Sequence, residues 1–305
     1  MTPKPKLVIG SRGSDLALYQ ANFIKDILTA GGNCFTEIKI IKTSGDRIAD
    51  LSFDKMEGKG FFTKELEEAL LARDIDLAVH SLKDLMTSQP AGLKLGAVGY
   101  RADRRELLII RPESKISEGL LPVKPGGIIG TSSARRQCQI AYHNQKLSIK
   151  DLRGNVPTRI NKLREGHYDA ILIATAGVTR LNLDLSDLEV VHLDEQQFLP
   201  APAQGTLGIQ IRENDPEVER LVAPLGSEEA TAEAKLERGL LAKFDLGCSL
   251  PLGVCSSRNQ KEYILKSVLG VRSGDDWVGL RQHEVQGTDI DSLIDQAFRY
   301  LSQDS

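Results

Sequence analysis

Apolar and polar positions in the first hundred residues alternate between a strand pattern and a helix pattern. The segment KLVIGSR predicts a strand, and DLALYQANFIKDIL predicts a helix that begins after Ser14 and ends at the pair Gly31 and Gly32. FTEIKIIK, KELEEALLARD and IDLAVHS continue as strand, helix and buried strand. This order predicts an α/β layer on a largely parallel sheet. The inward faces of the two helices are predicted at Ala17, Ala21, Ile24, Leu28, Leu66, Ala69 and Leu70.

The same plan recurs about one domain later. IIGTSSARRQCQIAY matches VIGSRGSDLALYQAN in kind, with an apolar strand, a glycine, a turn rich in Ser, Thr and Arg, and a helix. INKLREGHYDAILIATAG resembles LEEALLARDIDLAVHS, a helix followed by a strand that an aspartate precedes. The repetition predicts two related α/β domains of the type found in periplasmic binding proteins.

Breaks in this pattern suggest the domain borders. GYRADRREL interrupts it near Arg101 to Arg105, and the strand GTLGIQI is expected to return the chain to the first domain. A helix, the strands EYILKSVLGV and DWVGLRQHEV, and a terminal helix then predict a small α+β domain. We therefore expect domain 1 at residues 1–104 and 198–220, domain 2 at 105–197 and domain 3 at 221–305.

Composition limits the possible partners. The 305 residues carry 39 Lys and Arg against 42 Asp and Glu, a net charge of −3, so the chain has no overall basic field for nucleic acid or an anionic membrane. The four cysteines form no CxxC pair, and no histidine has metal-ligand spacing, so neither a disulfide framework nor a metal site is predicted. With no apolar run of signal or membrane length, we expect a cytoplasmic monomer that acts on a small molecule.

Arginines cluster where strands are predicted to give way to helices. In open α/β sheets ligands bind at the carboxyl ends of strands, and helix N-termini there attract anions. A single arginine at such a place is simply explained as a solvated surface residue, but six favour a ligand with many acidic groups. The six are Arg12, Arg135, Arg136, Arg153, Arg159 and Arg180.

Three further segments carry reactive side chains. AVHSLKDL ends a buried strand with Ser81, Lys83 and Asp84, and Asp84 could either serve a cationic reaction centre or cap a following helix. EGKGFFTKELE places Lys59 on a glycine-flanked loop that lacks the Walker spacing, where a solvated lysine is the default interpretation. DLGCSLPLG holds Cys248 on a constrained loop without a neighbouring base, so composition alone slightly favours an incidental thiol.

Together these segments resemble the porphobilinogen deaminase family, also called hydroxymethylbilane synthases, over nearly the whole chain. The resemblance implies a transferase of tetrapyrrole and haem biosynthesis. It would condense four porphobilinogen molecules head to tail, release ammonia, and use a covalent dipyrromethane cofactor held by a cysteine thioether. The motifs that carry the resemblance are GSRGSDLAL, KTSGDRIAD, GKGFFTKELE, DLAVHSLKD, GTSSARRQCQ, LRGNVPTR, YDAILIATAGVTRL, LPAPAQGTLGI and GCSLPLG.

The resemblance also assigns roles by position. Cys248 would carry the cofactor, and Asp84 would be the catalytic carboxylate that stabilises positive charge on the pyrrole. The expected cofactor-binding residues are Ser81, Lys83, Asp84, Thr131, Ser132, Ser133, Arg135, Arg136 and Arg153. The expected substrate-binding residues are Arg12, Ser14, Lys59, Arg153, Arg159 and Arg180.

Five positions depart from the family pattern. Met86 stands where a proline is expected, Ala134 replaces a larger apolar residue, and Pro157 replaces a glycine. Ala203 and Leu246 also replace glycines. None removes a reacting group, although they leave open a catalytically lapsed relative. The other rival is a non-catalytic binding module of the type II periplasmic kind, which has no use for a third domain that bears a cysteine.

Overall fold

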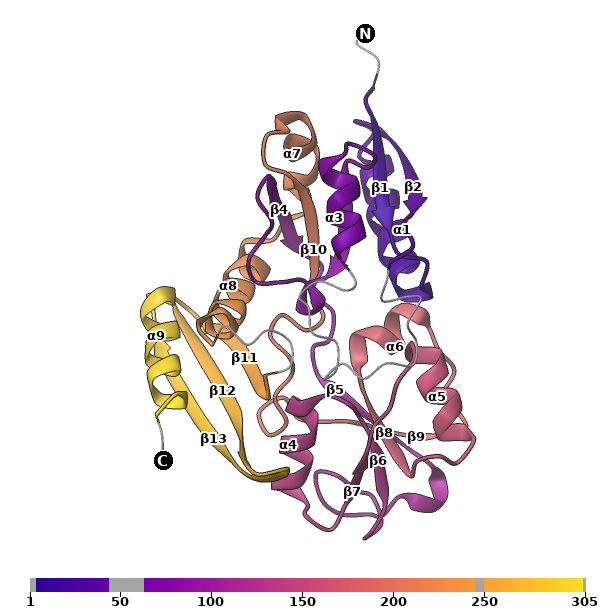
Figure 1. Cartoon of the computed structure of the whole chain (residues 1–305), viewed down its shortest axis with the longest axis vertical. Helices are drawn as coiled ribbons and strands as arrows, with labels where there is room; N and C mark the ends of the chain where they lie inside the picture. Colours follow the sequence, from indigo (N-terminus) through magenta and orange to yellow (C-terminus); the bar gives the residue numbers. More distant parts are fainter. Residues whose placement is uncertain (1–3, 44–62, 245–249, 304–305) are drawn as a thin grey trace. The chain divides into compact units, whose positions relative to one another are not determined.

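The computed structural model describes residues 4–43, 63–244 and 250–303 (Figure 1). These residues form two compact units, unit 1 (residues 4–43, 63–102 and 205–234) and unit 2 (residues 103–204, 235–244 and 250–303). Within the described ranges, no helix combines the length and apolar character needed to cross a membrane. The three-domain division stays a prediction, since the part of the chain expected to form domain 2 and most of that expected to form domain 3 share unit 2.

The first sheet lies in unit 1, with the strand order β2-β1-β3-β10-β4. Strand β1 is parallel to β2 and β3, whereas β10 is antiparallel to β3 and β4. The predicted return of GTLGIQI to the first domain is therefore confirmed. The strands are β1 (Lys6–Ser11), β2 (Phe35–Ile40), β3 (Leu77–Ser81), β4 (Leu93–Gly99) and β10 (Leu207–Arg212).

Helices and short 3-10 turns complete unit 1. Helix α1 has Ser14 at its N-cap, as predicted, and ends at Gly31, followed by Gly32 at φ 69°. Of its predicted inward face, Ala21, Ile24 and Leu28 are buried and join the core under the first sheet. The helical elements are α1 (Asp15–Ala30), η2 (Leu82–Asp84), α3 (Lys64–Leu71), α7 (Pro216–Val222) and η4 (Ala223–Leu225).

The second sheet lies in unit 2, with the order β7-β6-β8-β5-β9. Strand β6 is parallel to β7 and β8, whereas β5 is antiparallel to β8 and β9. Its strands are β5 (Glu106–Ile110), β6 (Ile128–Gly130), β7 (Ser148–Lys150), β8 (Ala170–Ala174) and β9 (Glu189–His192). The helices are η3 (Pro112–Ser114), α4 (Ala134–His143), α5 (Val156–Arg164) and α6 (Thr175–Leu181).

The two sheets correspond strand by strand and in register. Gly10 of β1 pairs with Ala78 of β3, and Gly130 of β6 pairs with Ile171 of β8. Likewise Leu207 faces Ser81 across β10 and β3, and Glu106 faces Ala174 across β5 and β8. In each sheet the antiparallel strand, β10 or β5, is the first strand after the chain returns or passes to that unit. The predicted repeat and α/β fold class are thus confirmed.

The C-terminal region is a three-stranded antiparallel sheet with helices, as expected of a small α+β region. Helix α8 passes from unit 1 into unit 2 between Ala234 and Lys235. Leu240 and Leu252 join Leu293 and Ala297 in the apolar core of this region. The elements are α8 (Glu228–Lys243), β11 (Leu252–Asn259), β12 (Glu262–Ser273), β13 (Asp276–Gly287) and α9 (Ile290–Leu301).

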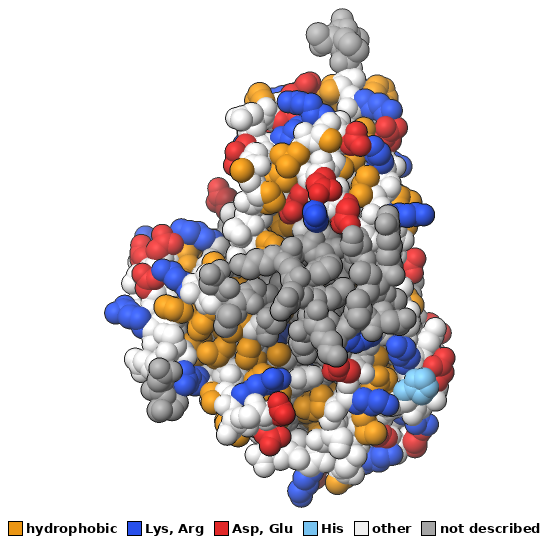
Figure 2. All heavy atoms as spheres, viewed as in Figure 1, with side chains coloured by type: hydrophobic (Ala, Val, Ile, Leu, Met, Phe, Trp, Pro, Cys, Tyr) orange, Lys and Arg blue, Asp and Glu red, His pale blue; other side chains and the backbone are white. Residues whose placement is uncertain are grey.

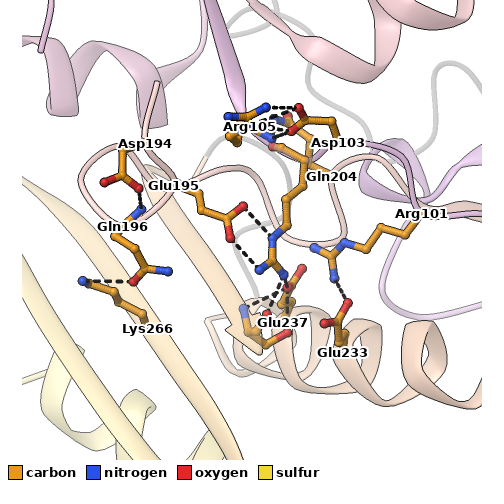
Figure 3. A network of polar contacts seen from close by, with 12 residues as sticks. Arg101, Asp103, Arg105, Asp194, Glu195, Gln196, Gln204, Glu233, Glu237 and Lys266 are labelled. Carbon is orange, nitrogen blue, oxygen red and sulfur yellow. Dashed lines mark hydrogen bonds and ion pairs between the residues drawn. The ribbon is translucent and has the colours of Figure 1, made fainter. Parts of the chain in front are cut away.

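A buried carboxylate anchors α8 and β11 within unit 2. Glu237 accepts the backbone N–H of Ala203 at 2.7 Å and the hydroxyl of Ser256 at 2.7 Å. Arg104 donates to both carboxylate oxygens of Glu195 at 2.8 Å, and Figure 3 shows Glu195 and Glu237 in this network. Because buried charges are stable only when paired and hydrogen-bonded, the network fixes the two elements that border residues 245–249.

Candidate active site

Asp84 follows the end of β3, a central strand of the first sheet. Leu82 and Leu85 on either side of it are buried, and the N–H of Leu82 donates to the carbonyl of Thr206 at 2.9 Å. Asp84 itself is exposed. Two buried leucines therefore anchor the backbone while the carboxylate between them stays accessible.

The alternative that Asp84 caps a helix is wrong. Asp84 is the last residue of η2, and Leu85 continues in an extended conformation at φ −86° and ψ 137°. The next element along the chain is strand β4. An aspartate that caps no helix at an exposed strand end favours the other interpretation, a carboxylate presented to a ligand.

Other predicted residues of unit 1 share this edge of the first sheet. Arg12 follows β1, which is parallel to β3, so both strands end on the same side. The hydroxyl of Ser81 accepts a hydrogen bond from Gln20 of α1 at 2.7 Å. Ser14, at the N-cap of α1, makes no capping bond with its side chain. The fold thus brings Arg12, Ser14, Ser81 and Lys83 to the strand ends that carry Asp84.

His80, which the sequence patterns did not single out, is buried in β3. Its Nε2 lies 3.1 Å from Oε1 of Gln210, a residue 130 positions away. Burial lowers the pKa of His80 to about 4, and the nearby positive charge of Arg12 acts in the same direction, while the hydrogen bond with Gln210 opposes it. The imidazole is therefore neutral near pH 7.

In unit 2 the end of β6 is followed by a turn of three hydroxyl residues, Thr131, Ser132 and Ser133. The hydroxyl of Thr131 accepts the N–H of Ser133 at 3.2 Å, and Ser133 is the N-cap of α4. The hydroxyl of Ser132 bonds the N–H of Leu152 at 3.1 Å and its carbonyl at 3.2 Å. Thr131 and Ser132 therefore stabilise the turn between β6 and α4.

Arg135 and Arg136 are buried around one carboxylate. Glu106 has no exposed surface, and its two oxygens lie 2.6 Å from Arg135 and 2.8 Å from Arg136. Arg135 also donates to the carbonyl of Leu199, and Arg136 to that of Leu172. Sequence reasoning did not single out Glu106. Arg135 thus has a structural role, and its contact with a ligand stays a prediction.

Arg136 retains one unused donor. Its Nε is buried without a hydrogen-bond partner among the described residues. Two guanidinium groups against one carboxylate also leave this cluster with one excess positive charge. Buried polar groups are nearly always satisfied, so this orphaned charged donor makes Arg136 a candidate for binding an acidic group of a ligand.

The remaining arginines occupy less uniform places than predicted. Arg153 lies between β7 and α5, with Asp151 at 3.7 Å, and Arg159 in the first turn of α5 donates to the carbonyl of Gly154 at 2.7 Å. Arg180 lies in the last turn of α6, so its predicted place at a strand-to-helix junction is wrong. Figure 2 shows charges of both signs mixed over the visible face, without a broad field of one sign.

Lys59, Cys248 and Leu246 lie outside the described residues. The described cysteines are Cys34, Cys138 and Cys255, and all three are buried and form no disulfide among the described residues. Among the residues that the structure describes, no group of three or more His, Cys, Asp or Glu side chains could hold a metal ion.

Two departures from the family pattern have a clear structural setting. Pro157 lies in the first turn of α5, where its missing N–H costs nothing, and Asn155 caps that helix by accepting the N–H of Thr158. Ala203 adopts φ 58°, in the left-handed region that favours glycine. Ala134 simply begins α4, and the carbonyl of Met86 accepts a bond from Gln89.

A family model described as "Porphobilinogen deaminase, dipyromethane cofactor binding domain" matches residues 7–220. The chain belongs to the porphobilinogen deaminase family. It is 41% identical over 307 residues to the porphobilinogen deaminase of a Nitratiruptor species, covering 98% of this chain and 96% of that one. With the porphobilinogen deaminase of a Roseiflexus species it shares 39% identity over 305 residues, covering 98% and 99%.

Among solved structures, the chain is similar to the periplasmic VFT2 domain of BvgS from Bordetella pertussis, with a TM-score of 0.42 and 9% identity over 77% of this chain and 93% of that one. It is also similar to the amino acid ABC transporter substrate-binding protein AbpA from Streptococcus pneumoniae, with a TM-score of 0.39 and 14% identity over 73% and 87%. Both TM-scores are low, and the fold class rests on the strand orders of the two sheets.

The described residues fit the cofactor that the family implies. Dipyrromethane carries acidic side groups, and the Arg136 cluster offers an unused donor with excess positive charge. Asp84 offers an exposed carboxylate for pyrrole N–H groups.

Proposed function

We propose that the protein condenses four porphobilinogen molecules head to tail into hydroxymethylbilane and releases one ammonia per condensation. The proposal makes it a hydroxymethylbilane synthase, a transferase of tetrapyrrole and haem biosynthesis. Asp84 carries the proposal, because it is an exposed carboxylate held between two buried leucines at the strand ends. When bound, the dipyrromethane cofactor would supply the primer, and Cys248 would hold it through a thioether.

Asp84 would act where positive charge develops on the substrate. Loss of ammonia from the aminomethyl group of porphobilinogen leaves a methylenepyrrolenine whose charge is shared with the ring nitrogen. A carboxylate that accepts the pyrrole N–H stabilises this charge more strongly than it stabilises the neutral substrate, and so lowers the barrier. The free α-carbon of the terminal pyrrole then attacks, and Asp84 can take up the α-proton that leaves.

The arginines would bind the acetate and propionate groups. Arg136 would use its free Nε, and Arg153 and Arg159 would reach ligands from the β7-to-α5 turn and the start of α5. In unit 1, Arg12 and Lys83 would do so beside Asp84, with Lys59 as a further proposed contact. Guanidinium groups suit this task because their planar N–H pairs match a carboxylate in shape and charge.

Two measurements test the proposal. Protein incubated with porphobilinogen should release ammonia and yield a linear tetrapyrrole detected by mass spectrometry. A protein that binds porphobilinogen without releasing ammonia would be a binding module or a lapsed relative.

The attachment of the cofactor has its own test. Intact protein from cells that make porphobilinogen should carry the mass of two linked pyrroles. The adduct should be lost in Cys248→Ala and retained in Cys255→Ala, whose thiol is buried in β11. An unmodified wild-type mass would contradict the covalent primer.

We also infer a cytoplasmic monomer. Cys34, Cys138 and Cys255 are buried without a disulfide among the described residues, which supports a reducing compartment. Light scattering coupled to size exclusion should give one chain mass, 33.4 kDa. A dimer mass at micromolar concentration would contradict this part of the proposal.

A further inference from the structure

A directional chain of hydrogen bonds connects a buried histidine in β3 to the segment that follows Asp84. The amide nitrogen of Gln210 donates to Oε1 of Gln89 at 2.8 Å and to Oε1 of Glu67 in α3 at 3.3 Å. Both partners are oxygens, so this end of the Gln210 amide must be its NH₂ group. The carbonyl end of the same amide therefore faces His80, whose Nε2 must carry the hydrogen.

The chain ends on the backbone beside Asp84. Gln89 accepts from Gln210 with its oxygen, so its own NH₂ group donates to the carbonyl of Met86 at 3.0 Å. Met86 is two residues beyond Asp84, and Leu85 between them is buried and extended. The order of donation is thus His80 to Gln210, Gln210 to Gln89, and Gln89 to Met86.

We propose that Gln210 and Gln89 are positioning residues that hold Asp84 for catalysis. Before Asp84, η2 and the bond from Leu82 to Thr206 fix the backbone. After Asp84, the backbone is held by the Gln89 bond to Met86, and Gln210 orients Gln89. Hydrogen bonds in a connected, partly buried chain reinforce one another, so losing one link loosens the rest. The inference rests on the proposed function, because that function gives Asp84 its catalytic role.

The test measures ammonia release from porphobilinogen by the full-length protein. Gln210→Met and Gln89→Met each break the chain with a side chain of similar length, and each should lower kcat about tenfold with KM within about twofold. The double variant should be no slower than the slower single variant, because both substitutions break the same chain. Independent damage at the two positions would instead multiply, to about a hundredfold.

Two further variants separate positioning from folding. Gln89→Glu keeps the shape and the acceptor for Gln210 but cannot donate to Met86, so it should match Gln89→Met in kcat. Ser267→Ala removes a buried hydroxyl in β12 and its bond to the carbonyl of His283. As a control it should lower the urea midpoint of unfolding but leave kcat unchanged.

The outcomes distinguish this inference from the proposed function. A wild-type protein that releases no ammonia would overturn the proposed function, and with it the inference. If the wild type is active, unchanged kcat in the glutamine variants overturns the inference alone. So does a rise in KM with constant kcat, or a multiplicative double variant.

Discussion

In the first sheet, β3 and β10 bury the polar pair His80 and Gln210, whereas the register-equivalent positions of the second sheet hold Ile173 and Ile109. At another pair of equivalent positions, on β10 and β5, the contrast is reversed, and the polar residue lies in the second sheet. There the second sheet buries Glu106, and the first sheet has Leu207. The two sheets share a strand order and a register, yet they bury polar groups of different charge in different places.

This difference matches the ligand chemistry proposed for each strand end. A neutral imidazole and two amides in unit 1 leave the nearby Asp84 as an exposed negative charge. In unit 2 a buried carboxylate gathers two guanidinium groups and leaves a net positive charge. A shared topology therefore places the strand ends, while different buried polar side chains lie beside an exposed carboxylate in unit 1 and hold two buried guanidinium groups in unit 2.

The largest effect is expected at Asp84. Asp84→Ala should lower kcat by roughly 10³-fold or more, because it removes the exposed carboxylate that is proposed to stabilise the developing charge. Asp84→Asn, which keeps the shape but not the charge, should lose nearly as much. Steady-state ammonia release provides the measurement.

The matched control is Asp26→Ala, an exposed aspartate on α1 that should keep full activity. Substrate binding by the arginines should survive in both Asp84 variants. Near-normal turnover in Asp84→Asn would show that the negative charge of Asp84 is not needed for catalysis.

The next largest effect is expected at Glu106. Glu106→Gln leaves the two buried guanidinium groups without a counter-charge and should lower the free energy of unfolding by about 3–5 kcal/mol. Urea denaturation measures this change. Adding Arg135→Met should regain part of the loss, since one buried charge is then removed.

Leu207 provides the comparison in the first sheet. Leu207→Met at the equivalent position should cost less than about 1.5 kcal/mol, because it conserves apolar volume. If the two substitutions lowered the free energy of unfolding by the same amount, the proposed contrast between Glu106 in the second sheet and Leu207 in the first would be wrong.

His80 should make the stability of the protein depend on pH. Its pKa is about 4 in the folded protein, against 6.5 for an ordinary histidine, so between these values the unfolded chain binds a proton that the folded protein does not. Stability from this group is complete above pH 6.5 and falls as the pH drops toward 4, by roughly 3 kcal/mol in all.

Urea midpoints across pH 4 to 7 test this expectation. His80→Gln should flatten the decline, whereas His143→Gln, an exposed histidine of α4, should keep the wild-type slope. A wild-type slope in His80→Gln would mean that other groups cause the pH dependence.

The smallest effects are expected where the chain crosses back toward β10. Ala203 is buried at φ 58°, so Ala203→Gly should stabilise the protein by about 1 kcal/mol. Gly205, two residues on, has φ 86°, and an added Cβ would lie 2.5 Å from the carbonyl oxygen of Ala102. Gly205→Ala should therefore cost about 2 kcal/mol or more. Thermal unfolding of the pair tests these opposite signs, and a loss of stability in Ala203→Gly would show that the left-handed alanine is not strained.

Local pattern was sufficient for most elements and for part of the site. The strand and helix periods predicted α1, α3 and β3 with their buried faces, and a strand ending in Ser81 predicted an exposed functional edge. The local pattern could not decide whether Asp84 caps a helix or faces a ligand, because capping depends on whether the chain after Leu85 forms a helix. That outcome depends on the buried contacts of Leu82 and Leu85.

Glu106, His80 and Gln210 could not be found in this way. Glu106 pairs with arginines 29 and 30 positions further along the chain, and His80 bonds a residue 130 positions away across an antiparallel strand. Arg135 was predicted as a ligand contact, but the structure shows it buried against Glu106 and Leu199. Sequence spacing carries no information about such pairs, because strand register over long separations is set by the assembled core.

The order of strands and helices, the repeat and the motifs that carry the family resemblance follow from the amino-acid sequence alone, because periodicity and turn residues are local properties of the chain. The folded chain was needed to show that β10 and β5 enter their sheets antiparallel, that Glu106 binds two arginines, and that Gln210 reaches Gln89. Those outcomes depend on burial, which forces each polar group to find a partner wherever the fold supplies one.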